Sequence, residues 1–321
     1  MSTLLVLASL LAAAPPAATA LQSRGEVFGA PFTLEIRDLD RAAAEAAFTE
    51  AFAAGARVEA DARALAHLVG GAGDVALSSG ALALLERTQA YCVWSEGAVS
   101  VLGGPLYRLW GLVERAPGLP SADKIDAAVA AARCDRLTLA PAGPSARLAA
   151  GSEIHLFPFA QGWAADAILD AAREAGAKNA WVSVGVVQKG IGPGPGGQGW
   201  PVVAPPVPGA ETPLDTFFLR DRAVAILSAS DRPISVGGER HAPYLDLSRG
   251  RPSDGVLQVL SVSERALDAQ SIAYAMFALG PRRGQFRLGG LDPAPSVLWQ
   301  LGGGEGPPLL TESAWWKVPK R

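Results

Sequence analysis

The sequence predicts an α+β fold in which mixed or antiparallel sheets pack against helices. Several Ala-rich segments with little Gly or Pro indicate helices, and short apolar or alternating segments indicate strands. The two kinds of segment do not alternate strictly, whereas a doubly wound parallel sheet needs repeated strand–helix–strand units. With 321 residues, 49% of them hydrophobic, the chain is able to bury a sizeable core.

The helical segments differ in how clearly their ends are marked. Residues 41–69 form one long helix or two shorter ones, because Gly55 is the main interruption. Ser79 is the predicted cap of a second helix, and Ser121 with Asp123 marks the start of a third. The predicted helices span residues 41–69, 78–91, 121–133, 162–174 and 267–279.

The strand segments are short. Residues 28–37 alternate apolar and polar side chains, which is typical of a half-buried strand, and residues 180–187 are apolar enough for a buried one. The Gly/Pro-rich segment 190–199 lacks the context of a phosphate-binding loop and is predicted to be a hairpin tip or surface loop. The predicted strands span residues 28–37, 154–159, 180–187, 216–228, 243–247, 257–263, 285–288 and 297–301.

The first twenty residues are typical of a cleavable signal peptide. An apolar run, too short to anchor in a bilayer, precedes a small-residue site at Ala18-Thr19-Ala20. An apolar first helix, or a start codon placed too early, is the alternative. We expect an exported protein of the periplasm or cell envelope, with residues 21–321 forming a single domain and no later transmembrane segment.

Charge and cysteine content narrow the function classes. The net charge of −3 argues against a nucleic-acid-binding face, which needs clustered Lys and Arg. Cys92 and Cys134 have no nearby Cys or His that would indicate a thiolate metal site. In an exported chain the two are able to pair, but the favoured interpretation is two buried, small hydrophobic side chains.

One segment carries a recognisable pattern. Residues 95–112 read SEGAVSVLGGPLYRLWGL. This segment resembles the S-G-G-A-F-D-x-T-V-G-P-L-x-x-L-W-G signature of the FAD:protein FMN transferases, the ApbE-like flavinyltransferases. Gly97, Gly104, Pro105 and Trp110 match, whereas Ser100 stands at the signature's Asp.

Further segments resemble family motifs in the same order along most of the chain. They are residues 28–32 (M-G-T-x-F), 154–166 (L-D-L-G-G-I-A-K-G-Y-A-V-D), 182–187 (L-V-N-x-G-G-D), 200–205 (P-W-x-V-x-x-x-P), 244–252 (the end of H-I-I-D-P-x-T-G-x-P) and 266–275 (A-D-A-L-A-T-A). The resemblance implies the flavinyltransferase architecture. It also implies FAD as substrate, Mg²⁺ as cofactor, and transfer of FMN to a Thr or Ser of an acceptor protein with release of AMP. The implied acceptor is a flavin-binding protein, for example of a membrane redox complex.

The resemblance also implies a set of site residues. The expected metal ligands are Asp268, the carbonyl of Ala160, and Ser228 or its neighbour Ser230. Asp246 is the expected catalytic carboxylate. His241 is the candidate replacement for the family's His, whose own position holds Pro243, although a surface imidazole is the favoured interpretation. The expected cofactor-binding residues are Gly29, Gly97, Gly104, Gln161, Gly162 and Gly185.

Several family side chains are replaced. Ile272 stands at the Thr four residues after the metal Asp and offers no oxygen ligand. Gln161 replaces the Lys of A-K-G, and Phe157-Pro158 replaces the preceding Gly-Gly. His155 stands at the Asp of the same motif, and Asp166 matches a retained Asp.

Three hypotheses follow from this pattern. The chain is an active flavinyltransferase with a rebuilt metal site, a degenerate member that binds flavin or a partner protein without transfer, or an unrelated exported domain. The collinear motifs disfavour the third hypothesis. The loss of several charged and metal-binding side chains favours weak or absent activity.

Overall fold

The structure is a computed structural model that describes residues 20–114, 118–140, 143–206, 211, 213–302 and 309–313. The predicted signal peptide, apart from Ala20, lies outside the described residues. Among the described residues, no helix is both long enough and apolar enough to cross a bilayer.

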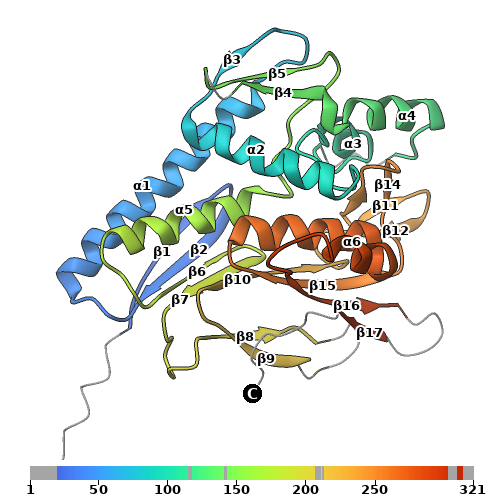
Figure 1. The fold of residues 1–321 in the computed structure, drawn as a ribbon. Coiled ribbons are helices and arrows are strands. Elements are labelled where there is room, and N and C mark those ends of the chain that lie inside the picture. The colour runs from blue at the N-terminus through green and yellow to red at the C-terminus, as the bar shows by residue number, and fades with distance from the viewer. Residues whose placement is uncertain are drawn as a thin grey trace, which may run out of the picture.

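An antiparallel sheet of eight strands forms the body of the protein (Figure 1). Its order is β1-β2-β6-β7-β10-β15-β16-β17, and each neighbouring pair is antiparallel. The strands are β1 (Leu21–Val27), β2 (Ala30–Ile36), β6 (Ala180–Val184), β7 (Val187–Ile191), β10 (Arg222–Ser228), β15 (Val256–Ser263), β16 (Ser296–Leu301) and β17 (Leu309–Glu312). This arrangement confirms the predicted α+β class.

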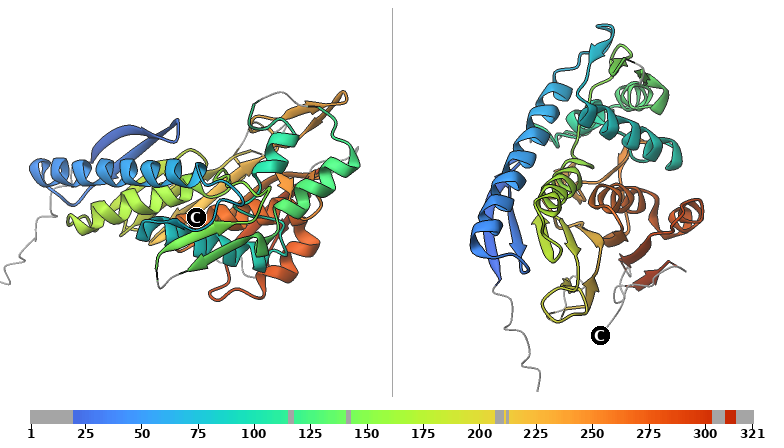
Figure 2. Two further views of the ribbon diagram at one scale, coloured as in Figure 1. Left: turned by 90° about the horizontal axis from the view of Figure 1, so that it is seen from above. Right: turned by 60° about the vertical axis from the view of Figure 1, so that its left-hand side comes forward.

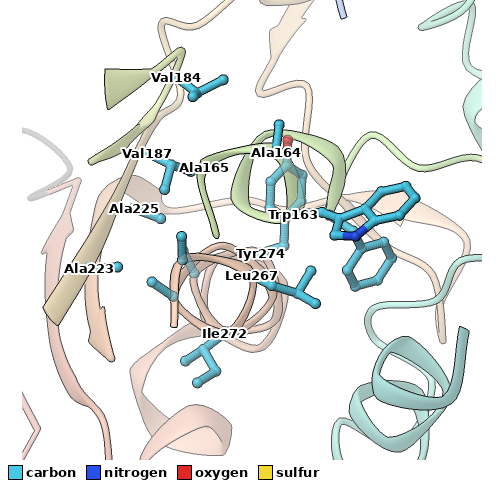
Figure 3. Packing of buried hydrophobic residues seen from close by; sticks show 14 of the residues in the cluster. Trp163, Ala164, Ala165, Val184, Val187, Ala223, Ala225, Leu267, Ile272 and Tyr274 are labelled. Carbon is cyan, nitrogen blue, oxygen red and sulfur yellow. The ribbon is translucent and has the colours of Figure 1, made fainter. Parts of the chain in front are cut away.

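Helices cover one face of the sheet and a hairpin covers the other (Figures 1 and 2). The helices are α1 (Arg41–Ala66), α5 (Ala160–Glu174) and α6 (Ala266–Leu288), and the hairpin is β8 (Trp200–Ala204) with β9 (Asp215–Leu219). Alanines such as Ala164, Ala165, Ala223 and Ala225 fill the space between α5, α6 and the sheet (Figure 3). Their small side chains let the helices and strands approach closely.

A second group of elements lies over one end of this body (Figure 1). It holds α2 (Ser79–Trp94), α3 (Gly104–Leu109), α4 (Ala122–Ala131), the short helix η1 (Cys134–Arg136) and the sheet β3 (Val75–Ala76), β5 (Ser145–Leu148), β4 (Leu137–Ala140). The hairpins β11 (Ile234–Val236) with β12 (Glu239–His241) and β13 (Leu245–Asp246) with β14 (Arg251–Pro252) complete it. Apolar side chains of α3, α4, β11 and β13 form a separate small core.

Most helices agree with the sequence predictions. Residues 41–66 form one helix, in which Gly55 packs against Ile168 without a break. The cap of α2 is Ser78 rather than Ser79, because the Ser78 hydroxyl accepts the Ala81 amide. Ser121 stands at the N-cap of α4 without a side-chain bond, and Asp123 lies in the first turn as expected.

Several strand predictions were wrong. Residues 154–156 have no regular secondary structure and residues 157–159 form a turn, in which the Phe159 and Ala160 amides both donate to the Leu156 carbonyl. Residues 285–288 belong to α6, which restarts after a kink at Gly280 and Pro281. The predicted strands 180–187 and 216–228 each contain a turn, and the predicted strand 243–247 is reduced to Leu245–Asp246. Strand β1 was not foreseen.

The favoured interpretation of the cysteines was also wrong. Cys92 at the end of α2 and Cys134 in η1 form a disulfide, with Cα atoms 5.7 Å apart. The bond fastens α2 to the segment that leads into β4. It closes a loop whose ends are 42 residues apart, which restricts the unfolded chain.

We predict that replacing both cysteines, Cys92→Ala with Cys134→Ala, lowers the free energy of unfolding by about 4 kcal/mol, the loop-entropy value for this separation. Urea denaturation followed by circular dichroism measures the change. A reductant should destabilise the parent protein similarly and leave the double variant unchanged. Equal stability of the oxidised parent and the variant would contradict the prediction.

Candidate functional site

Two cavities lie side by side where α1, the start of α5 and the β11 region meet. The first, called the α1 cavity, has a volume of about 510 Å³ and is lined by Phe28, Gly29, Glu59, Ala62, Arg63, Ala66, Ile154, Leu156 and Ala160, among others. The second, called the β11 cavity, has a volume of about 300 Å³ and is lined by Tyr107, Gly111, Leu112, Arg232, Pro233, Ile234, Ser235 and Pro243, among others. His155 and Phe157 line both. Two loop residues therefore stand between the cavities.

A buried carboxylate sets the position of α6 next to these cavities. Asp166 on α5 is 2% exposed and accepts the first amides of α6, from Ala266 at 2.9 Å and Leu267 at 3.0 Å. The Lys189 ammonium on β7 donates to the same carboxylate at 2.6 Å. A negative group at a helix N-terminus satisfies unpaired amides and interacts favourably with the helix dipole. Asp166 therefore joins α5, α6 and the sheet.

The start of α5 packs directly on α6. A Cβ atom at Gly162 would lie 2.5 Å from the Ala266 carbonyl oxygen, so this crossing requires glycine. The Gly162 amide donates to Gln270 Oε1 at 2.7 Å, and Gln270 Nε2 lies 3.4 Å from the Phe157 carbonyl oxygen. Gln270 therefore joins α6 to both ends of segment 157–162 by hydrogen bonds.

Gln161 and Gly185, both expected from the resemblance to bind the cofactor, lie in contact with each other. The Val186 amide donates to Gln161 Oε1 at 3.1 Å, and the Gln161 side chain occupies the space where a Cβ of residue 185 would lie. Gly185 has φ of +53° in the turn between β6 and β7. The polar end of Gln161 is thus used to hold this turn.

Asp268 and Ile272 lie on another side of α6. Asp268 accepts two hydrogen bonds from Arg87 on α2, from Nε at 2.9 Å and Nη2 at 2.7 Å. Ile272 is 2% exposed in the core between helices and sheet. Figure 3 shows Ile272 and Tyr274 leaving α6 on opposite sides. The carboxylate of Asp268 is therefore already neutralised by a guanidinium.

Tyr274 follows Gln270 by four residues, so the two side chains lie on the same side of α6. Its ring packs edge-on against Phe157, with centroids 5.7 Å apart. Burial raises the pKa of Tyr274 well above its usual value, so the phenol stays neutral near pH 7. The face of α6 toward segment 157–162 thus carries an amide and a neutral phenol.

Asp246 and His241 lie apart from the described lining of both cavities. Asp246 is buried and accepts bonds from the Ser248 amide at 3.1 Å and from Arg283 Nη1 at 3.0 Å. His241 is half-buried, with its ring beside Trp110 and its Nδ1 4.0 Å from Asp254. These contacts stabilise the β11–β14 region.

The remaining predicted residues are scattered. Gly29 and Ala160 line the α1 cavity. Gly97 follows the end of α2, where its amide donates to Cys92, and Gly104 packs against Glu153. At the end of β10, the Ser228 hydroxyl donates a hydrogen bond to the Ser230 hydroxyl, with the two oxygens 3.2 Å apart.

His155, which lines both cavities, is held by a backbone bond and by packing of its ring. Its amide donates to the Val101 carbonyl, and its ring packs against Tyr107 with centroids 5.0 Å apart. Burial lowers the pKa of His155, so the imidazole is neutral at pH 7.

Magnesium does not fit the groups that this site offers. Mg²⁺ requires oxygen ligands, usually including one or two carboxylates. The Asp268 oxygens are bound to Arg87, and Gln270 Oε1 is bound to Gly162. Within the described ranges, no group of three or more His, Cys, Asp or Glu side chains is arranged to hold a metal.

Comparison with known proteins decides the family. The model of the ApbE family matches residues 28–290. The chain belongs to the ApbE family. This ApbE-family protein is 24% identical over 266 residues to a FAD:protein FMN transferase of Klebsiella pneumoniae (strain 342), covering 80% of this chain and 82% of that relative.

Solved structures of ApbE proteins have the same fold. The ApbE protein of Thermotoga maritima superimposes with a TM-score of 0.79 at 21% identity, covering 92% of this chain and 97% of its own. The flavinyl transferase ApbE of Pseudomonas stutzeri, in its apo form, superimposes with a TM-score of 0.78 at 21% identity, covering 92% of this chain and 95% of its own. The flavin transferase ApbE of Vibrio cholerae superimposes with a TM-score of 0.79 at 20% identity, covering 94% of this chain and 99% of its own.

Sequence analysis did not single out Gln270, Tyr274 or Arg87. A signal for the first two was present, because Ala269, Ala273 and Ala275 match three of the four alanines of A-D-A-L-A-T-A when the motif is shifted by two residues. No local pattern indicated Arg87, because its partner Asp268 is 181 residues away.

We predict that Asp166→Asn destabilises this ApbE-family protein by about 3–5 kcal/mol, because it leaves the buried Lys189 ammonium without its partner. Asp170→Asn is the matched control. Its carboxylate is 3.9 Å from the same ammonium and 39% exposed, so we expect a change below about 1 kcal/mol. Urea denaturation measures both variants, and equal losses would refute the role given to Asp166.

Proposed function

We propose that the protein binds a flavin nucleotide in the cleft that contains the α1 and β11 cavities and does not transfer FMN through a magnesium ion. The observation that carries this proposal is the α6 face toward segment 157–162. It presents Gln270 and Tyr274, and neither supplies the anionic oxygen that Mg²⁺ favours.

The proposal rests on a register for the family's A-D-A-L-A-T-A motif. We place its metal Asp at Gln270 and its Thr at Tyr274, because these positions face the segment that contains Ala160. In this register Ala269, Ala273 and Ala275 match alanines of the motif, whereas the register first expected matches only Ala269 and Ala273. The register first expected, with Asp268 and Ile272, leads to the same result, because Arg87 binds the carboxylate and Ile272 is buried and apolar.

The phosphate-binding side of the cleft supports the same proposal. Gln161 carries no charge, and its amide oxygen is already bonded to the Val186 amide. Pro158 has no amide hydrogen to donate. Charge-assisted bonds are about twice as strong as neutral ones, so these replacements weaken the contacts to a pyrophosphate.

We further propose that the protein is exported to the periplasm or cell envelope. The Cys92–Cys134 disulfide supports this location, because disulfides persist in oxidising compartments. The family implies a flavin-binding acceptor protein as partner. In this proposal the protein binds its partner without transferring FMN to it covalently.

The first experiment is a titration of the purified protein with FAD and with FMN, with and without millimolar magnesium, followed by flavin fluorescence. Because Gln270 and Tyr274 offer no anionic oxygen to a metal ion, we expect flavin to bind with an affinity that chelation by EDTA leaves unchanged within about twofold. AMP release with an added acceptor domain is measured in parallel. Metal-dependent AMP release would contradict the proposal.

A second experiment restores the ligands. We predict that Gln270→Asp with Tyr274→Thr makes flavin binding magnesium-dependent, with affinity rising about tenfold or more on adding the ion, since hard oxygens then face Ala160. The control Gln270→Asn with Tyr274→Phe adds no such ligand. Ile272→Thr tests the other register and should show no magnesium effect. A magnesium response of Ile272→Thr, with none in the restored double variant, would overturn the assignment.

A further inference from the structure

We propose that Phe157 divides the flavin-binding cleft and makes the protein selective for the mononucleotide FMN over the dinucleotide FAD. The inference rests on the proposed function and specifies the ligand of the same cleft. Its starting observation is that Phe157 is part of the wall of both cavities and is still 39% exposed.

Three positions to which the family resemblance assigns roles in flavin binding, metal binding or catalysis are divided between the two cavities. Gly29 and Ala160 line the α1 cavity, whereas Pro243, at the position of the family's His, lines the β11 cavity. A ligand that reaches both sets must pass the wall formed by His155 and Phe157. In the family motif that wall contains Gly-Gly, which leaves room for a ligand, whereas Phe157 fills it.

Phe157 is held in place from several directions. Its ring meets Tyr274 at 5.7 Å and both Tyr107 and His155 at 6.2 Å between centroids. The backbone of the same segment is held by the turn in which the Phe159 and Ala160 amides donate to the Leu156 carbonyl. The ring therefore acts as a fixed partition that a ligand does not easily displace.

The α1 cavity by itself suits a mononucleotide. Its volume of about 510 Å³ lies within the usual range for small-molecule sites, and its wall is largely apolar, as an isoalloxazine ring requires. Arg63 and Glu59 are its charged lining residues, and Glu59 accepts the Phe28 amide at 2.7 Å. The Arg63 guanidinium matches the single phosphate of FMN. FAD adds an adenylate group, which has to pass Phe157 to enter the β11 cavity.

The test compares the affinities of FMN, FAD and riboflavin for the parent protein and for Phe157→Gly by fluorescence titration. We expect the parent to bind FMN at least about tenfold more tightly than FAD, and Phe157→Gly to reduce that ratio to about twofold or less. Phe286→Ala is the matched control, because Phe286 is 78% exposed near the end of α6 and lines neither cavity. This control should keep the parent ratio.

Arg63→Ala gives an independent readout. We expect this variant to bind FMN about tenfold more weakly than the parent does. Its affinity for riboflavin, which lacks the phosphate, should stay within about twofold of the parent value. Equal affinity of the parent for FAD and FMN, or an unchanged ratio in folded Phe157→Gly, would overturn the inference while the proposed function stands. Failure of all flavins to bind every variant would overturn both.

Discussion

The contact between Asp166, Lys189 and the first turn of α6 is the constraint on which the rest of the structure depends. A buried carboxylate needs several hydrogen bonds to be stable away from water, and this one has them from two α6 amides and an ammonium. Because the three partners come from α5, β7 and α6, their geometry fixes the helix layer on the sheet. The direction in which every α6 side chain points follows from that fixed position.

The scaffold and the chemistry of the site are thereby separated. Gly162 still allows α5 and α6 to touch, and Asp166 still caps α6, so the ApbE fold is retained. Several α6 side chains, such as Ala269, Ile272 and Phe277, pack in the core and are tied to the fold. Gln270 faces segment 157–162 and accepts the Gly162 amide, so a structural bond stands where the proposed register places the family's metal ligand.

The sequence was sufficient for the α+β class and for elements with a strong period, such as α1 and β15. It was insufficient where long-range contacts decide the structure. The apolar run at 154–159 resembles a strand, but its His155 amide bonds to the distant Val101 carbonyl instead of pairing in the main sheet. The pairing of Cys92 with Cys134 and of Arg87 with Asp268 joins distant segments that no local pattern connects. Two registers of the motif on α6 differ by two residues, because Asp268 matches in one and Ala275 only in the other, while Ala269 and Ala273 match in both.

Binding of flavin without a magnesium ion is tested most directly by anomalous diffraction from crystals soaked with Mn²⁺ and a flavin nucleotide, because Mn²⁺ accepts the same oxygen ligands as Mg²⁺. We expect bound flavin and no anomalous peak within coordination distance of Gln270, Tyr274 or the Ala160 carbonyl oxygen. A manganese peak at that place, with the flavin phosphates among its ligands, would contradict it.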